Sequence, residues 1–240
     1  MKKLCVDQKK SVVEKLAALF KDLLPQDIDD VVAQAKDQAS AQVLEDRKRY
    51  LGQLFDSQMR TLEDRGCPKA IIEMLQKKRD EVLARATKME IPEGNIPFLP
   101  VILRSYLGIY GLMPMVRNGD KAGFTYLDPN EIFDNESAPK EPYFIYDVED
   151  GRATLGKSPE KAEEIIKGQS RLCHIPDEDI ALAIYTNVLS DHYLWSTGSR
   201  YKDANDVPLV CLGDGRPRLS WGSADDSHVR WGSASCRSRE

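Results

Sequence analysis

The segment PRLSWGSADDSHVRWGSASC, residues 217–236, is the most informative part of the sequence for the architecture of the C-terminal half. It contains Trp-Gly-Ser-Ala twice, at Trp221–Ala224 and at Trp231–Ala234. The segment 225–227, Asp-Asp-Ser, separates the copies, and these side chains favour turns because they bond to nearby backbone. The repeat therefore predicts a β-hairpin with one tryptophan on each strand, both pointing into the core.

This hairpin would place basic and hydroxyl groups on one polar face. Side chains alternate between the two faces of a strand, so Arg218 and Ser220 on one arm would lie beside His228 and Arg230 on the other. Arg200, in a polar loop, would add a further guanidinium. Arginine offers forked donors that match two oxygens of a phosphate or carboxylate, which predicts a site for an anionic small molecule. An ordinary wet face of an antiparallel sheet carries the same residue types, and this alternative stays open.

A catalytic alternative uses the end of the same segment. Cys236 or Ser235 would act as nucleophile with His228 as base, in a hydrolase or transferase. A reactive thiol needs a nearby base and stabilisation of the oxyanion. The sequence Gly-Ser-Ala-Ser, residues 232–235, lacks the Gly-x-Ser-x-Gly elbow of α/β-hydrolases.

Cysteine and histidine usage predicts no metal site. The five cysteines are scattered and include no Cys-x-x-Cys pair, which argues against a disulfide scaffold and a zinc finger. Cys173 and His174 are neighbours, but adjacent side chains point apart on regular backbone, and no second pair at ligand spacing supports them. No nucleotide-binding glycine motif, His-Glu-x-x-His or EF-hand loop is present, so no cofactor is expected.

Residues 8–90 contain few helix breakers, and their apolar residues recur at steps of three and four, which predicts helices. The first would end at Pro25, a long second helix would follow, and Pro68 would open a third. These helices would form an antiparallel bundle or a protruding hairpin that mediates self-association or contact with a protein partner. The charged block Glu45–Arg49 indicates a solvated face, and nucleic-acid binding through Arg47–Arg49 is the weaker alternative.

Beyond residue 90 the pattern becomes mixed. Asn118-Gly119-Asp120 predicts a hairpin turn, and Tyr143–Val148 and Pro208–Leu212 read as buried strands. Helices are expected after Ser158 and from Pro176. The predicted fold class is α+β, with N-terminal antiparallel helices followed by a mixed, largely antiparallel sheet and two or three helices. The expected domains are a helical region, 1–90, and an α+β domain, 91–240.

Composition restricts the classes of protein. Of 240 residues, 41% are hydrophobic and 30% charged, as in soluble globular proteins. The N-terminus becomes polar at once, which indicates no signal peptide, and no apolar run reaches membrane-spanning length, so a cytoplasmic location is expected. The net charge is −5, with the acidic excess in residues 91–240, and this makes nucleic acid an unlikely partner.

Several short motifs resemble an uncharacterised bacterial family that is known only as a domain of unknown function. The resemblance covers about residues 95–237, and its most specific part is the terminal Gly-Ser-Ala-Ser-Cys. It rests on Gly198-Ser199-Arg200, Val207-Pro208-Leu209, His228 and Gly232–Cys236, with looser agreement at Ile96-Pro97-Phe98, Met115–Arg117, Gly123-Phe124 and Tyr143–Asp147. The resemblance implies a bacterial, soluble, intracellular protein and supplies no activity, cofactor or catalytic residue.

These observations predict a non-catalytic intracellular binding or interaction protein with an anion-accepting site in its α+β domain. The hydrolase or transferase is the first alternative. A nucleic-acid-associated protein acting through the helical region is the second.

Overall fold

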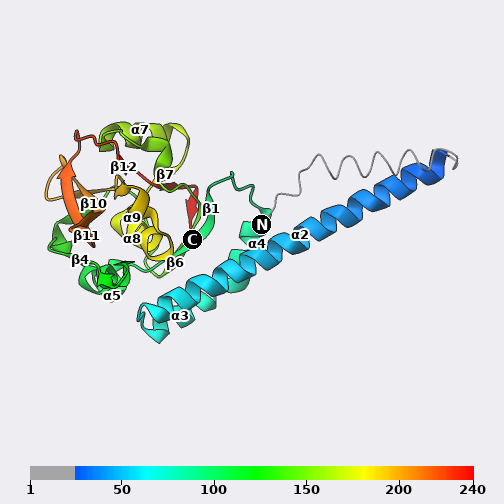
Figure 1. The fold of residues 1–240 in the computed structure, drawn as a ribbon, viewed down its shortest axis with the longest axis horizontal. Helices are drawn as coiled ribbons and strands as arrows, with labels where there is room; N and C mark the ends of the chain where they lie inside the picture. The colour runs from blue at the N-terminus through cyan, green and yellow to red at the C-terminus, as the bar shows by residue number, and fades with distance from the viewer. Residues whose placement is uncertain (1–24) are drawn as a thin grey trace. The chain divides into compact units, whose positions relative to one another are not determined.

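The computed structural model describes residues 25–240 (Figure 1). The first expected helix, which would end at Pro25, lies outside the described residues. Contacts between residues divide the chain between Tyr50 and Leu51, which is earlier than the boundary expected near residue 90. Within residues 25–240, no helix combines the length and the apolar character needed to cross a membrane.

The long second helix, α2, spans Pro25–Asp64. From residue 30 to Tyr50 its side chains are almost all exposed. The charged block Glu45–Arg49 is largely solvated, and its charges pair within the helix, Lys48 with Glu45 and Arg49 with Asp46. Exposed pairs of this kind add only a few tenths of a kcal/mol each, about 0.3–0.5.

The C-terminal part of α2 belongs to the core of the second unit. Leu51, Phe55, Met59 and Leu62 are buried and lie at helical spacing on one stripe. Two further helices follow, α3 (Lys69–Gln76) and α4 (Arg79–Lys88), where the sequence predicted one. They bury apolar residues at helical spacing, namely Ile71, Ile72, Leu75, Val82 and Ala86.

Aromatic packing joins these helices to the first sheet. The ring of Phe55 stacks on Phe144 of β6 (Tyr143–Val148) with centroids 5.7 Å apart, and it lies 6.3 Å from Phe98 of β1 (Ile96–Val101). Gln58 donates from Nε2 to the Phe98 carbonyl oxygen at 2.9 Å. Residues 51–88 are therefore part of one core with the sheet, which explains the early division.

Short strands form five sheets within residues 25–240. β1, β6 and β14 (Ser238–Arg239) form an antiparallel sheet in the order β1-β6-β14. The largest has the order β12-β8-β10-β11-β4, from β4 (Phe124–Thr125), β8 (Tyr193–Trp195), β10 (Asp206–Gly213), β11 (Arg216–Ser223) and β12 (Trp231–Gly232). Three two-stranded pairs complete the set: β2 (Arg117–Asn118) with β3 (Lys121–Ala122), β5 (Ile132–Asp134) with β9 (Ser199–Tyr201), and β7 (Leu172–Cys173) with β13 (Ser235–Cys236).

Helices cover these sheets. The helix α8 (Pro176–Tyr185) packs against β1 and β10, and α9 (Val188–Asp191) packs against β8 and β10 (Figure 1). The other elements are α5 (Arg104–Leu107), α6 (Ile109–Leu112), α7 (Pro159–Gly168) and the 3₁₀ turns Met113–Met115, Pro129–Glu131 and Arg152–Thr154. The α+β fold class is confirmed, as are the predicted strand β6 and the helices α7 and α8.

The expected tryptophan hairpin is wrong. β11 pairs with β10 over eight residue pairs, and its other edge is taken by β4. The turn Asp214-Gly215 has positive φ at both residues, 53° and 70°, which suits the tight type I′ connection and aligns β10 and β11 at once. No edge of β11 remains for β12, which instead adds to β8. Trp221 is 47% exposed, whereas Trp231 is half-buried against Trp195.

Candidate functional site

The five residues of the expected anion site lie on three separate parts of the C-terminal unit. Arg218 and Ser220 are two residues apart on β11 and share one face of that strand. His228 and Arg230 come just before β12, and β8 and β10 stand between β12 and β11. Arg200 lies on β9, outside this sheet. The structure therefore brings Arg218 and Ser220 together and leaves the other three elsewhere.

Those three residues have contacts of their own. Arg200 donates from Nη2 to Glu163 Oε2 at 2.7 Å and from Nη1 to backbone carbonyl oxygens. The Arg230 guanidinium lies 5.2 Å from the centroid of the Tyr193 ring. His228 is exposed, and its Nδ1 accepts a hydrogen bond from the Arg230 backbone N–H at 3.2 Å. These contacts indicate local structural roles.

The Arg200→Gln variant tests this role for Arg200. Burial alone would raise the pKa of Glu163, but hydrogen bonds from Lys167 and Arg200 lower it below its usual value of 4.5. A lowered pKa adds stability above the unfolded-state value, and this stability is lost as the pH falls through the folded-state value. The variant should therefore be less stable at pH 7, by less than about 1 kcal/mol, and the difference should shrink as the pH falls below 4.5.

Urea unfolding at a series of pH values measures this difference. Lys161→Gln, on an exposed position of the same helix α7, is the control and should show no such dependence. A difference for Arg200→Gln that is independent of pH would contradict a role through Glu163.

An open cleft of about 520 Å³ lies beside the turn that joins β10 to β11. The hairpin β2–β3, the strand β4 and this turn supply its lining, which consists of Asp120, Lys121, Ala122, Phe124, Gly213, Asp214 and Arg216. Lys121 Nζ donates to the Asp214 carbonyl oxygen at 3.0 Å, and Arg216 Nε donates to the Ala122 carbonyl oxygen at 2.7 Å. These bonds hold the hairpin against the turn.

The cations of this cleft have no ionic partner in the described part of the chain. Lys121 and Arg216 bond to backbone carbonyl oxygens, and the Arg216 guanidinium lies 4.6 Å from the Phe124 ring centroid. Arg218 lies outside the cleft lining, two residues from Arg216 on the same face of β11, and a Cβ built on Gly213 would lie 3.4 Å from its Cζ. The Nε of Arg218 is buried without a hydrogen-bond partner among the described residues. Asp120 and Asp214 also line the cleft, so its two basic and two acidic residues balance, and its hydrogen-bond donors rather than a net positive charge would recognise an anion.

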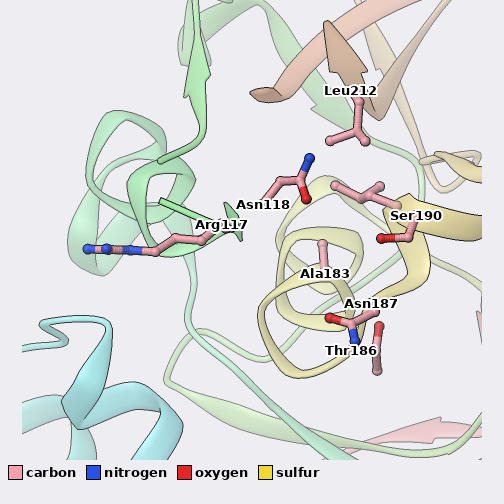
Figure 2. A pocket seen from close by; sticks show the side chains of 9 residues that line it. Arg117, Asn118, Ala183, Thr186, Asn187, Ser190 and Leu212 are labelled. Carbon is pink, nitrogen blue, oxygen red and sulfur yellow. The ribbon is translucent and has the colours of Figure 1, made fainter. Parts of the chain in front are cut away.

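A smaller cavity lies beside the β2–β3 hairpin, next to the junction of α8 and α9 (Figure 2). Figure 2 shows Asn118 and Ser190 pointing into it from opposite sides, whereas Arg117 points away. Its volume is about 60 Å³. Small-molecule sites usually have volumes of about 300–1,000 Å³, so this cavity is too small for a typical ligand.

The first turn of α8 holds three buried carboxylates in succession. Asp177, Glu178 and Asp179 are consecutive and at most 1% exposed. Negative charge at this end of a helix is favourable against the helix dipole. Each carboxylate also has a basic partner at hydrogen-bond distance, and these partners are, in the same order, Arg104, Arg239 and His174.

Burial and these partners shift the three carboxylates differently. Burial raises the pKa of Asp177 to about 6, and the charge of Arg104 opposes that rise. Burial alone would also raise the pKa of Glu178, but the hydrogen bonds and charge of Arg239 lower it below its usual value. Burial raises the pKa of Asp179, although His174 opposes the shift.

Cys236 lies beside this turn. Its neighbouring histidine is therefore His174 and not His228, which was the expected base. Its Sγ, a ring nitrogen of His174 and a carboxylate oxygen of Glu178 lie within 4.8 Å of one another. Burial and the charge of Glu178 raise the pKa of the Cys236 thiol well above its usual value, so the thiol is protonated at neutral pH. Ser235 is also buried, and its hydroxyl accepts a hydrogen bond from Arg171 Nε at 2.8 Å. Neither group is activated for attack.

No spacing motif in the sequence groups His174, Glu178 and Asp179 with Cys236. A local signal was present, because three acidic residues follow Pro176 directly and a histidine stands two residues before it. The pairing of β13 with β7 brings Cys236 to this turn from far along the chain. Residues that lie so far apart along the chain leave no local sequence pattern from which their contact could be predicted.

Comparison with known families places the cleft and the buried turn inside one matched region. Residues 56–240 match DUF5701, a family of unknown function, so the match begins before the resemblance expected from residue 95. No curated protein and no solved structure matches the chain. Because the matched region covers most of the sequence, the chain belongs to the DUF5701 family of unknown function.

Proposed function

We propose that this protein is a non-catalytic binding protein that takes an anionic small molecule in the cleft beside the β10–β11 turn. The observation that carries the proposal is the pair Lys121 and Arg216, which line an open cleft of about 520 Å³ without an ionic partner among the described residues. A guanidinium group offers paired donors that match two oxygens of a phosphate or carboxylate. The ligand therefore carries such a group.

Two neighbouring features support this choice of ligand. Arg218 lies on the same face of β11 as Arg216, and its buried Nε has no partner among the described residues. A buried donor without a partner is uncommon, and a water or ligand beside Arg218 would supply that partner. Phe124 offers an aromatic surface beside the cations, which suits a ligand with a planar part.

The state of the thiol favours binding over catalysis. Cys236 is fully buried, and its raised pKa keeps it protonated, whereas a nucleophilic cysteine needs a thiolate and access to substrate. The catalytic alternative therefore lacks an activated group at the position where the sequence placed it.

Inorganic phosphate is the probe for this proposal. Added at increasing concentration, it should raise the melting temperature of the full chain, because a ligand that binds only the folded state stabilises it. The double variant Arg216→Gln/Arg218→Gln should lose at least about four-fifths of this shift, since both forked donors are removed. Differential scanning fluorimetry measures the shift, and calorimetric titration measures the affinity.

Two arginine variants serve as matched controls. Arg60→Gln changes an exposed residue of α2 outside the cleft, and Arg230→Gln changes a residue next to β12. Both should keep the full phosphate shift, and sodium chloride at equal ionic strength should produce none. The proposal fails if phosphate has no effect on the wild type, or if the double variant responds as the wild type does.

A further inference from the structure

His174 carries a buried ring nitrogen with no partner. The residue is fully buried, and its Nδ1 lies 3.0 Å from Asp179 Oδ1. The carboxylate accepts a hydrogen bond from Nδ1–H, and in this tautomer of the neutral imidazole Nε2 carries the free lone pair. Nε2 is itself buried and has no hydrogen-bond partner among the described residues. A buried acceptor of this kind is rare and indicates a group that completes the site.

The atoms around the His174 ring form a set of metal donors. A ring nitrogen of His174, the Sγ of Cys236 and a carboxylate oxygen of Glu178 lie within 4.8 Å of one another. One sulfur, one nitrogen and one oxygen suit a borderline-soft ion such as Zn²⁺. Calcium and magnesium prefer oxygen alone, so this set disfavours them.

The groups behind the donors are those that orient metal ligands. A histidine that binds a metal usually donates its other ring N–H to a carboxylate, which is the arrangement of His174 and Asp179. Ser196 holds Asp179 in turn, through a hydrogen bond from Oγ to Oδ2 of 2.6 Å. Arg239 donates to both oxygens of Glu178, at 2.6 and 2.8 Å. These bonds orient the ring of His174 and the carboxylate of Glu178.

Zinc binds the thiolate form of cysteine, so the Cys236 thiol would release its proton to solvent as the ion binds.

We infer that His174, Glu178 and Cys236 bind a zinc ion, with Asp179 as the residue that positions His174. Zinc bonds of about 2.0–2.3 Å require the donor atoms to approach one another by about 1 Å on binding. Glu178 accepts four hydrogen bonds, from Tyr143, the Ile175 N–H and two nitrogens of Arg239, so its ligating oxygen gives up one of them. Three protein ligands leave the fourth tetrahedral position to a water or another small ligand.

Cobalt substitution of the full chain tests the inference. Zinc should bind the purified protein with one ion per chain by mass spectrometry, and each ion bound should release about one proton, from Cys236, in calorimetry across buffers. Co²⁺ in its place should give a thiolate-to-cobalt absorption band. A wild-type protein that binds no zinc, or that binds Co²⁺ without this band, overturns the inference whether or not any variant folds.

Variants assign the ligands. Cys236→Ser should remove the thiolate band, His174→Gln should abolish tight binding, and Asp179→Asn should weaken it by about 10–100-fold. Cys211→Ser is the control, because Cys211 is a buried cysteine of a different cluster, and it should keep the band. Near-ultraviolet circular dichroism of the metal-free variants shows which of them fold. Retention of the band in folded Cys236→Ser, or its loss in folded Cys211→Ser, would refute the assignment.

Discussion

Replacement of Arg239 by methionine is expected to lower the free energy of unfolding by about 3–5 kcal/mol. The side chain of Arg239 is 4% exposed, and its guanidinium donates to both oxygens of Glu178, which is fully buried. Methionine keeps much of the apolar stem and removes the charge. Glu178 would then be a buried carboxylate without its counter-charge, which is the costly outcome for a buried ion pair. Urea unfolding at pH 7 measures the loss.

Arg237→Met, two residues earlier in the chain, is the matched control. Its side chain is 53% exposed, and its partner Asp147 keeps hydrogen bonds from Arg171 and Asn95. Its loss should stay below about 1 kcal/mol. The double variant Glu178→Gln/Arg239→Met should recover part of the stability, because it removes the stranded charge. Equal effects of Arg239→Met and Arg237→Met would contradict the buried pair as a source of stability.

Gly232→Ala is the second substitution for which a large loss is expected, about 3 kcal/mol or more. A Cβ at this position would lie 2.1 Å from the Gly151 carbonyl oxygen and 3.0 Å from its carbonyl carbon. Both obstacles are backbone atoms, so β12 or the 150–154 turn must move. Thr154 Oγ1 donates to the Ser233 carbonyl oxygen at 3.1 Å and accepts from the Ser233 N–H at 2.7 Å, and movement would strain both bonds. Thermal unfolding should show a melting temperature lower by roughly 6–12 °C.

The first copy of the repeat provides the comparison. A Cβ at Gly222 would lie 2.8 Å from Cη2 of the Trp195 side chain, so a ring rather than backbone must shift. Gly222→Ala should therefore cost less than Gly232→Ala. Gly168→Ala is the control, because nothing lies within 4 Å of its added Cβ. If Gly232→Ala were as stable as Gly168→Ala, the close approach of β12 and Gly151 would not exist in solution.

This contrast gives the repeated Trp-Gly-Ser-Ala an explanation other than the expected tryptophan hairpin. The two tryptophans differ in environment, since Trp221 is exposed beside Tyr201 and Trp231 packs edge-on against Trp195. What the copies share is a glycine where another group approaches closely. The repeat therefore reflects two separate close contacts rather than two arms of one hairpin.

Features encoded within a short stretch of chain were predictable. The strand Tyr143–Val148 is an apolar run closed by a turn, and α8 begins at a proline followed by acidic residues. These elements are determined by interactions with neighbouring backbone and with the helix dipole, so they can be predicted without knowledge of the fold. The turn at Asn118-Gly119 was equally legible, because it needs only a residue that accepts positive φ.

Strand order and the candidate sites were not predictable in this way. The assignment of His228 and Arg230 to Arg218 depended on β11 pairing with β12, but the tight Asp214-Gly215 turn had already committed β11 to β10. The boundary expected near residue 90 separates Phe55 from Phe98 and Phe144, whose rings it contacts. Which segment pairs with a strand edge, or packs into a core, depends on all the segments that compete for that position. A local sequence pattern does not contain this information.

Local patterning alone established the α+β class and most of the longer elements, since hydrogen bonds and side-chain periodicity along consecutive residues specify them. Tertiary structure alone decided which charges meet. Arg239 reaches Glu178, and Cys236 reaches His174, only because β14 and β13 return to β6 and β7 from the end of the chain. The energy of a buried charge depends on which opposite charge lies beside it in the folded structure. The spacing of residues along the sequence does not specify that neighbour.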